Sequence, residues 1–169
     1  SDNVISPDLS INSGVELTVS AELIDALSIS GGSNSVLIVN DLSSTTDLSS
    51  VNMALDSSFT VIVDMDTSMI FTGHLITTTG GRNPDISLQS VNGSQFTVAA
   101  ELIDGLNVIG VSGSKLKITD MSSTTDLSSV DFNGTGNVYD YQAEFDTSMT
   151  FIGNLFGVNN APLVYLKNG

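Results

Sequence analysis

The chain has 169 residues, 40% of them hydrophobic, and no cysteine. It can bury a substantial core, but it has no disulfide, thiolate nucleophile or cysteine-ligated metal. Its formal net charge is −15, from 19 acidic and 4 basic residues, and four scattered cations cannot follow a nucleic-acid backbone. Composition therefore excludes nucleic acid as a partner, and the lack of an apolar run of about 20 residues argues against membrane insertion.

The chain repeats itself at an interval of about 79 residues, and this is its strongest signal. The repeated segments are 19–27 (VSAELIDAL) and 98–106 (VAAELIDGL), 41–51 (DLSSTTDLSSV) and 120–130 (DMSSTTDLSSV), and 66–69 and 146–149 (DTSM). Self-similarity at a fixed period is typical of stacked repeat architectures. The expected organisation is a lead-in cut from a longer chain (1–14), repeat unit 1 (15–85), repeat unit 2 (86–160) and a C-terminal tail (161–169).

Short runs of β-branched and aromatic residues, bounded by Gly, Ser, Asn or Asp, recur along both units and predict short strands. In chain order they are 16–19, 27–29, 36–39, 59–63, 69–71, 86–88, 95–98, 106–109, 115–119, 138–139 and 150–152. Two segments, Ala21–Leu27 and its copy Ala100–Leu106, have apolar residues at helical spacing but are too short for independent helices. We interpret each as a corner or a single turn between strands.

These strands favour an all-β fold, namely a right-handed parallel β-solenoid (β-helix). Coils of roughly 20 residues would give about eight coils, four per unit. We expect one continuous stack in which the second unit follows the first by translation along a single axis. The alternative is a pair of tandem antiparallel β-sandwiches of about 80 residues each. Hairpin dipeptides are rare, with Asn-Gly at 92–93, 133–134 and the last two residues, 168–169, which favours the solenoid.

The pattern of residues 17–51 (LTVSAELIDALSISG…SVLIVNDLSSTTDLSSV) resembles the degenerate repeat units of giant bacterial surface proteins of adhesin-like and S-layer-like type. The resemblance covers about 15–75 and 96–155. It implies a β-solenoid with a structural or adhesive role in a secreted protein. It supplies no catalytic residues.

Six acidic positions recur in both units and suggest calcium, a hard cation that takes carboxylate oxygens. Asp64 and Asp66 alternate along a strand and so share a face. The preferred metal ligands are therefore Asp64, Asp66, Glu144 and Asp146, and the second choice is Asp41, Asp47, Asp120 and Asp126. The competing interpretation is that the second set forms Asx turns, in which the carboxylates accept hydrogen bonds from nearby backbone N–H groups.

Catalysis is poorly supported. Paired aspartates would suit a β-helical polysaccharide-active enzyme, but the pair occurs in both units and the chain has no Trp to stack on sugars. His74 is the only histidine, and its copy position holds Asn154, so we predict no role for it.

The sequence predicts a non-enzymatic structural or adhesive module of a larger extracellular or cell-surface protein, stabilised by calcium. Unpaired strands at the solenoid ends, or neighbouring repeats, would drive self-association. The alternative is a module that binds a surface glycan or a host protein, and a polysaccharide-active enzyme is the third possibility.

Overall fold

The computed structural model describes residues 8–77, 80–90, 93–111 and 113–131, and the backbone of two further strands at 141–145 and 163–166. The strands predicted at 138–139 and 150–152 lie outside these residues. Within them the chain is all-β, and none of its helices is long and apolar enough to cross a membrane.

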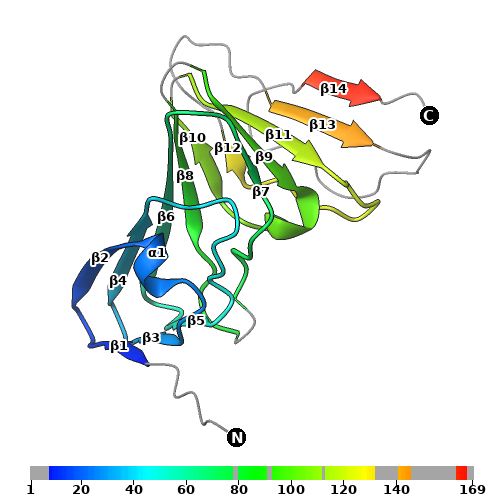
Figure 1. The fold of residues 1–169 in the computed structure, drawn as a ribbon. Coiled ribbons are helices and arrows are strands. Elements are labelled where there is room, and N and C mark those ends of the chain that lie inside the picture. The colour runs from blue at the N-terminus through cyan, green and yellow to red at the C-terminus, as the bar shows by residue number, and fades with distance from the viewer. Residues whose placement is uncertain are drawn as a thin grey trace, which may run out of the picture.

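The strands form three sheets (Figure 1). The first contains β1 (Leu9–Ile11), β3 (Ile29–Gly31) and β5 (Val51–Met53). The second, here called the shared sheet, contains β2 (Glu16–Ser20), β4 (Val36–Asn40), β6 (Ser58–Met65), β8 (Asp85–Ser90), β10 (Val108–Gly110) and β12 (Val130–Asp131). The third contains β7 (Met69–Phe71), β9 (Gln95–Ala99), β11 (Lys115–Thr119), β13 (Tyr141–Phe145) and β14 (Leu163–Leu166).

Every pairing between these strands is parallel, and each strand stacks on an equivalent strand one coil away. Ile29 pairs with Val51, for example, and Val108 pairs with Val130. The predicted parallel β-solenoid is confirmed, and the alternative of two antiparallel sandwiches is wrong.

The solenoid has about five turns over the part of the chain that the structure describes, so the prediction of about eight coils is wrong. The physical reason lies in the third coil of the first unit. It carries β5, the eight-residue β6 and also β7 before the chain reaches β8. This coil is therefore much longer than the coils that precede it.

The predicted single turns are confirmed in both units. Helix α1 (Ala21–Ile24) and the 3₁₀ turn η1 (Ala100–Leu102) each follow a strand at once. Ala21 and Ile24 are buried, and so are their copies Ala100 and Ile103. Each turn thus closes the core where the chain leaves one face of the solenoid.

One hydrophobic core runs through the described residues of both units, from Ile11 to Val130, because alternate side chains of the stacked strands point inward. Leu37, Phe59, Ile86 and Val108 are among its buried members. The aromatic rings of Phe71 and Phe96 meet across the junction between the units, with centroids 5.9 Å apart. The described residues of the two units thus share one core.

The two units are not related by translation alone. Offset by 79 residues, β3 and β4 of the first unit correspond to β10 and β11 of the second. Translation would stack β8 on β5 and β9 on β6. Instead β8 stacks on β6, and β9 stacks on β7.

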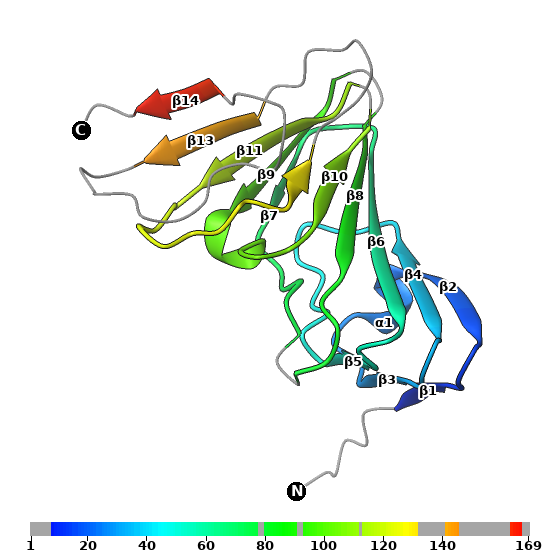
Figure 2. The same ribbon diagram turned by 180° about the vertical axis from the view of Figure 1, so that it is seen from behind.

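The length of β6 explains this change of face. Its first half pairs with β4, from Ser58 to Val61, and its last six residues pair with β8. The sheet formed by β2, β4 and β6 in unit 1 therefore continues into β8, β10 and β12 of unit 2. Together these six strands form one twisted sheet (Figures 1 and 2). β7 takes up the place beside β9 that translation would have given to β6.

Candidate functional site

The most closely repeated motif, Ser-Ser-Thr-Thr-Asp, builds a corner of the solenoid. The Thr46 hydroxyl, on a side chain buried in the corner, accepts a hydrogen bond from the Ser43 N–H at 3.0 Å. Thr125 accepts the equivalent bond from the Ser122 N–H at 3.0 Å. The identical geometry in both units shows that these hydroxyls satisfy backbone donors that the turn would otherwise leave unpaired.

Replacing Thr46 with valine is expected to lower the free energy of unfolding by about 1–3 kcal/mol, because it leaves the Ser43 N–H without an acceptor. Denaturant unfolding measures the change. Thr45→Val is the matched control, since Thr45 is exposed in the same turn, and it should stay within about 0.5 kcal/mol of the parent. Equal losses for the two variants would contradict the proposed role of the Thr46 hydroxyl.

The repeated aspartates connect successive coils. Asp25 Oδ1 accepts a hydrogen bond from the Asp47 N–H at 2.7 Å, and Asp47 Oδ1 accepts one from the Ser49 N–H at 2.9 Å. In the second unit the corresponding distances are 2.6 Å and 3.0 Å, and the residues are Asp104, Asp126 and Ser128. The predicted Asx turns are therefore present at Asp47 and Asp126.

The link from Asp25 to Asp47 is absent from the predictions, although the sequence contains its signal. Asp25 and Asp47 are 22 residues apart, as are Asp104 and Asp126. This spacing equals the pairing offset of stacked strands such as Ile29 and Val51. A carboxylate repeated at the coil length indicates a bond between coils.

Asp41 and Asp120 directly follow strands β4 and β11 and adopt the left-handed conformation, with φ of 53° and 55°. Aspartate tolerates this conformation better than most residues. The repeated acid at this position thus turns the chain out of the strand. Neither carboxylate accepts a hydrogen bond from a backbone N–H of the described residues, and Asp120 Oδ2 accepts one from the Thr119 hydroxyl at 2.9 Å, so the Asx-turn interpretation is wrong for this pair.

Asp47 has a perturbed titration. Its pKa lies below the ordinary value, mainly because the Ser49 hydroxyl and N–H donate hydrogen bonds to it. Partial burial opposes the shift, and nearby His74 favours it. His74 Nδ1 lies 3.9 Å from Asp47 Oδ2, and 64% of the histidine side chain is exposed. His74 also joins the coils through its backbone, since its N–H donates to the Thr46 carbonyl and its carbonyl accepts from the Leu48 N–H.

Because the pKa of Asp47 is lowered in the folded state, the free energy of unfolding depends on pH. As pH falls through about 4, the unfolded chain takes up a proton at this site before the folded chain does. The stability that Asp47 contributes is present above that range and is lost below it. Urea midpoints measured from pH 7 to pH 3 should therefore fall less for Asp47→Asn than for the parent, with Ser49→Ala intermediate. Parallel midpoint curves would contradict this assignment.

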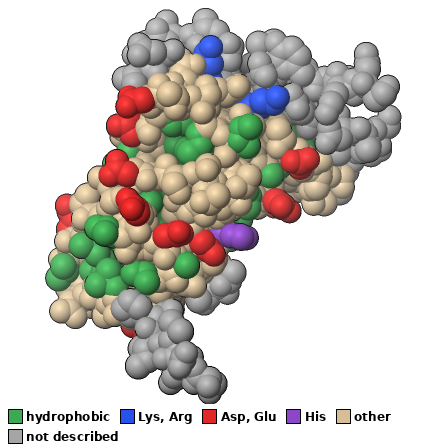
Figure 3. Space-filling model, viewed as in Figure 1, with side chains coloured by type: hydrophobic (Ala, Val, Ile, Leu, Met, Phe, Trp, Pro, Cys, Tyr) green, Lys and Arg blue, Asp and Glu red, His purple; other side chains and the backbone are tan. Residues whose placement is uncertain are grey.

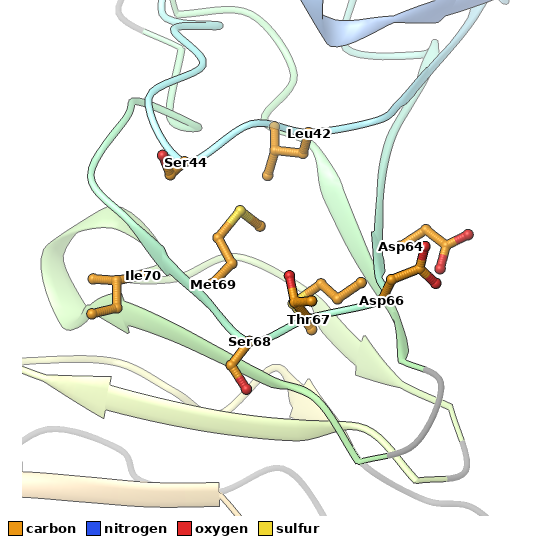
Figure 4. Close-up of a pocket in the computed structure, with 9 residues that line it drawn as sticks. Leu42, Ser44, Asp64, Asp66, Thr67, Ser68, Met69 and Ile70 are labelled. Carbon is orange, nitrogen blue, oxygen red and sulfur yellow. The ribbon is translucent and has the colours of Figure 1, made fainter.

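An open hollow of about 540 Å³ lies between the segment after β6 and the corner after β4. Its lining residues are Leu42, Ser44, Asp64, Met65, Asp66, Thr67, Ser68, Met69 and Ile70. Asp64 and Asp66 are both exposed, as alternation along β6 predicts, and their carboxylates lie on the opposite side from Leu42 and Met69 (Figure 4). The hollow thus has an acidic side and an apolar side.

The structure tests the calcium ligands only in part. Glu144 belongs to β13, where only the backbone is described, and Asp146 lies outside the described residues. Within the described part of the chain, no three acidic or histidine side chains cluster as they would around a metal ion. Asp64 and Asp66 could supply carboxylate oxygens to a cation, with water completing its coordination.

Comparisons with protein-family models, with curated proteins and with solved structures gave no match. The geometry of the chain itself is therefore the basis for the functional argument.

Proposed function

We propose that this chain is a non-enzymatic structural or adhesive repeat module of a larger secreted or cell-surface protein, of the kind found in adhesin-like and S-layer-like bacterial proteins. We expect its coils to be right-handed, because nearly all connections between parallel strands of one sheet are right-handed. The module would contribute length, stiffness and a repeated surface. It would associate with itself through its ends or with neighbouring repeats.

One observation carries the proposal: the side chains that recur between the units act in the fold itself. Thr46 and Thr125 hold corners, and Asp25 and Asp104 join coils. A catalytic centre is built once from unlike groups, whereas these polar groups recur with the same backbone partners. Duplication of this kind favours an array over an active site.

Two measurements on the whole protein test the proposal. Antibodies against the chain should label intact cells that make the full protein, and light scattering should show assembly that grows with concentration. A cytoplasmic location would overturn the surface role. Release of reducing ends from polysaccharide, lost on Asp64→Asn, would favour the enzyme instead.

The hollow beside β6 supports a second candidate, a module that binds a surface glycan or a host protein. Its exposed carboxylates and hydroxyls offer hydrogen-bond acceptors, and Leu42 and Met69 offer an apolar wall. A glycan array would test it. Binding that Met69→Asn abolishes would support this candidate, and binding that this variant leaves unchanged would exclude the hollow as the site.

We also propose that calcium stabilises the module through Asp64, Asp66, Glu144 and Asp146. A cation that binds only the folded state at about 100 times its Kd adds about 2.7 kcal/mol, or roughly 5–10 °C in Tm for a chain of this size. Calorimetry should show this increase over a sodium control of matched ionic strength. Asp66→Asn combined with Asp146→Asn should abolish it.

Two outcomes of that measurement would revise the proposal. Identical melting curves in calcium and in chelator would leave the repeated acids with structural roles alone. Stabilisation that survives the double substitution would move the ion to the second set, Asp41, Asp47, Asp120 and Asp126.

A further inference from the structure

Strands β2 and β9 occupy the same position in their units but have different neighbours. β9 lies between β11 and β7 in the third sheet. β2 pairs with β4 on one side, and no described strand pairs with its other side. The repeat therefore supplies an internal comparison: it shows what β2 would look like with that side covered.

Side chains around β2 are more exposed than their copies around β9. Phe96 and Val98 of β9 are 0% and 1% exposed, whereas Leu17 and Val19 at the same positions of β2 are only partly buried. The flanking residues Val15 and Leu23 are 46% and 69% exposed. Apolar side chains gather at the end of the molecule that carries β1, β2 and α1, at the lower left of Figure 3.

The backbone of β2 is arranged to accept another parallel strand. In a parallel pair, alternate residues direct both their N–H and C=O to the same neighbour. The Val15 carbonyl accepts from the Val36 N–H of β4, so Glu16, Thr18 and Ser20 direct their groups to the open side. We call these groups the β2 edge.

The copy of this edge on β9 is already occupied by β7. Met69 pairs with Phe96 and Phe71 with Val98, so that the Phe71 ring reaches the Phe96 ring. The Ser68 hydroxyl just before β7 accepts a hydrogen bond from the Gln95 N–H at 3.0 Å. Gln95 is the copy of Glu16, and its N–H points as predicted for the open side of β2.

A sequence that matches the one forming β7 recurs later in the chain. The motif Asp-Thr-Ser-Met-x-Phe occurs at 66–71, where it forms β7, and again at 146–151, outside the described residues. We infer that the β2 edge is an interaction surface for a second copy of this chain, whose residues 149–151 add to β2 as β7 adds to β9. Its Phe151 would cover Leu17, and its Ser148 hydroxyl would accept from the Glu16 N–H.

The inference rests on the proposed role as a repeat module and specifies where two modules meet. For β5 and β12 the repeat offers no covered copy with which to compare an open edge. β5 and β12 are equivalent strands, and each ends its sheet. In the third sheet, β7 covers the outer side of β9. The contact proposed here would cover the outer side of β2 in the shared sheet in the same way.

The absence of cysteine allows a direct test by cross-linking. Ile70 pairs with Thr97, so the corresponding pair across the interface is Thr150 of one copy and Thr18 of the other. Thr18→Cys protein mixed with Thr150→Cys protein should give a heterodimer with a short bismaleimide, at a yield at least ten-fold above Thr18→Cys mixed with Ile109→Cys. Ile109 is a matched exposed control on β10, 45% exposed. Equal yields for the two mixtures would overturn the inference.

A second measurement separates this contact from assembly in general. Leu23→Asn should weaken self-association about ten-fold in sedimentation velocity, whereas Leu55→Asn should leave it unchanged, although Leu55 is 76% exposed. Neither change touches the core, so both variants should fold. If Leu23→Asn leaves self-association unchanged and no cross-link forms between positions 18 and 150, the β2 edge is not the interface. That outcome would not contradict the proposed role as a repeat module. A strictly monomeric chain would overturn both the edge and the proposed self-association.

Discussion

Phe96→Ala is expected to lower the free energy of unfolding by about 3–5 kcal/mol, the usual cost of removing a fully buried aromatic side chain. Phe96 lies where β9 meets β7, and its ring contacts that of Phe71. The cavity would open at the junction between the two units, where coils on both sides are held by strand pairing and relax little. Urea unfolding followed by circular dichroism measures the loss.

The matching position of the first unit provides the control. Leu17 corresponds to Phe96 but is only partly buried, so Leu17→Ala should cost about 1–2 kcal/mol. Both variants should be measured at low protein concentration, where assembly does not contribute. Losses of equal size would mean that the junction is no better packed than the open end.

Gly73→Ala is expected to cost about 3 kcal/mol or more, because the backbone of the neighbouring coil occupies the space that a side chain would need. A Cβ at Gly73 would overlap the Thr46 carbonyl oxygen and lie 2.8 Å from Phe71 Cζ. The same oxygen accepts the His74 N–H at 3.0 Å, so the two coils cannot separate without breaking their stacking. A fall in Tm of several degrees checks the expectation.

Gly105→Ala is the control for a glycine whose requirement is conformational. Gly105 has φ of 69°, and a Cβ there meets nothing within 4 Å. Its copy is Ala26, which adopts φ of 56° in the first unit, so alanine is compatible with this turn at a cost of about 1 kcal/mol. If Gly73→Ala proved as mild as Gly105→Ala, the close approach of the two coils would be wrong.

Local chemistry made much of this fold predictable. Alternation of apolar residues located strands such as β4 and β11, and the short helical spacing after β2 correctly predicted one turn. The Asx-turn interpretation, which competed with calcium for four repeated acids, is correct at Asp47 and Asp126, where the role depends only on a residue two positions along the chain. Such features arise from interactions within a few residues.

Long-range pairing was not predictable in the same way. The sequence of β7 predicts a short strand, but nothing within Met69–Phe71 indicates that this strand pairs with β9 and begins a new sheet. The pairing of one half of β6 with β4 and the other half with β8 also depends on residues far along the chain. These two features changed both the number of coils and the relation between the units. For the candidate metal site, alternation placed Asp64 and Asp66 on one exposed face, but the sequence contained no signal for the hollow beside them.

The change of face at β6 has a mechanical consequence for any protein in which the unit recurs. Two units that share a sheet cannot separate independently, because tension along the stack must first break the hydrogen bonds between β6 and β8 and between β7 and β9. Loss of one unit would also strip the edge from the sheet of its neighbour, so rupture should spread across the boundary. Because β6 carries the stack from one face to another, a row of such units would change direction at every junction.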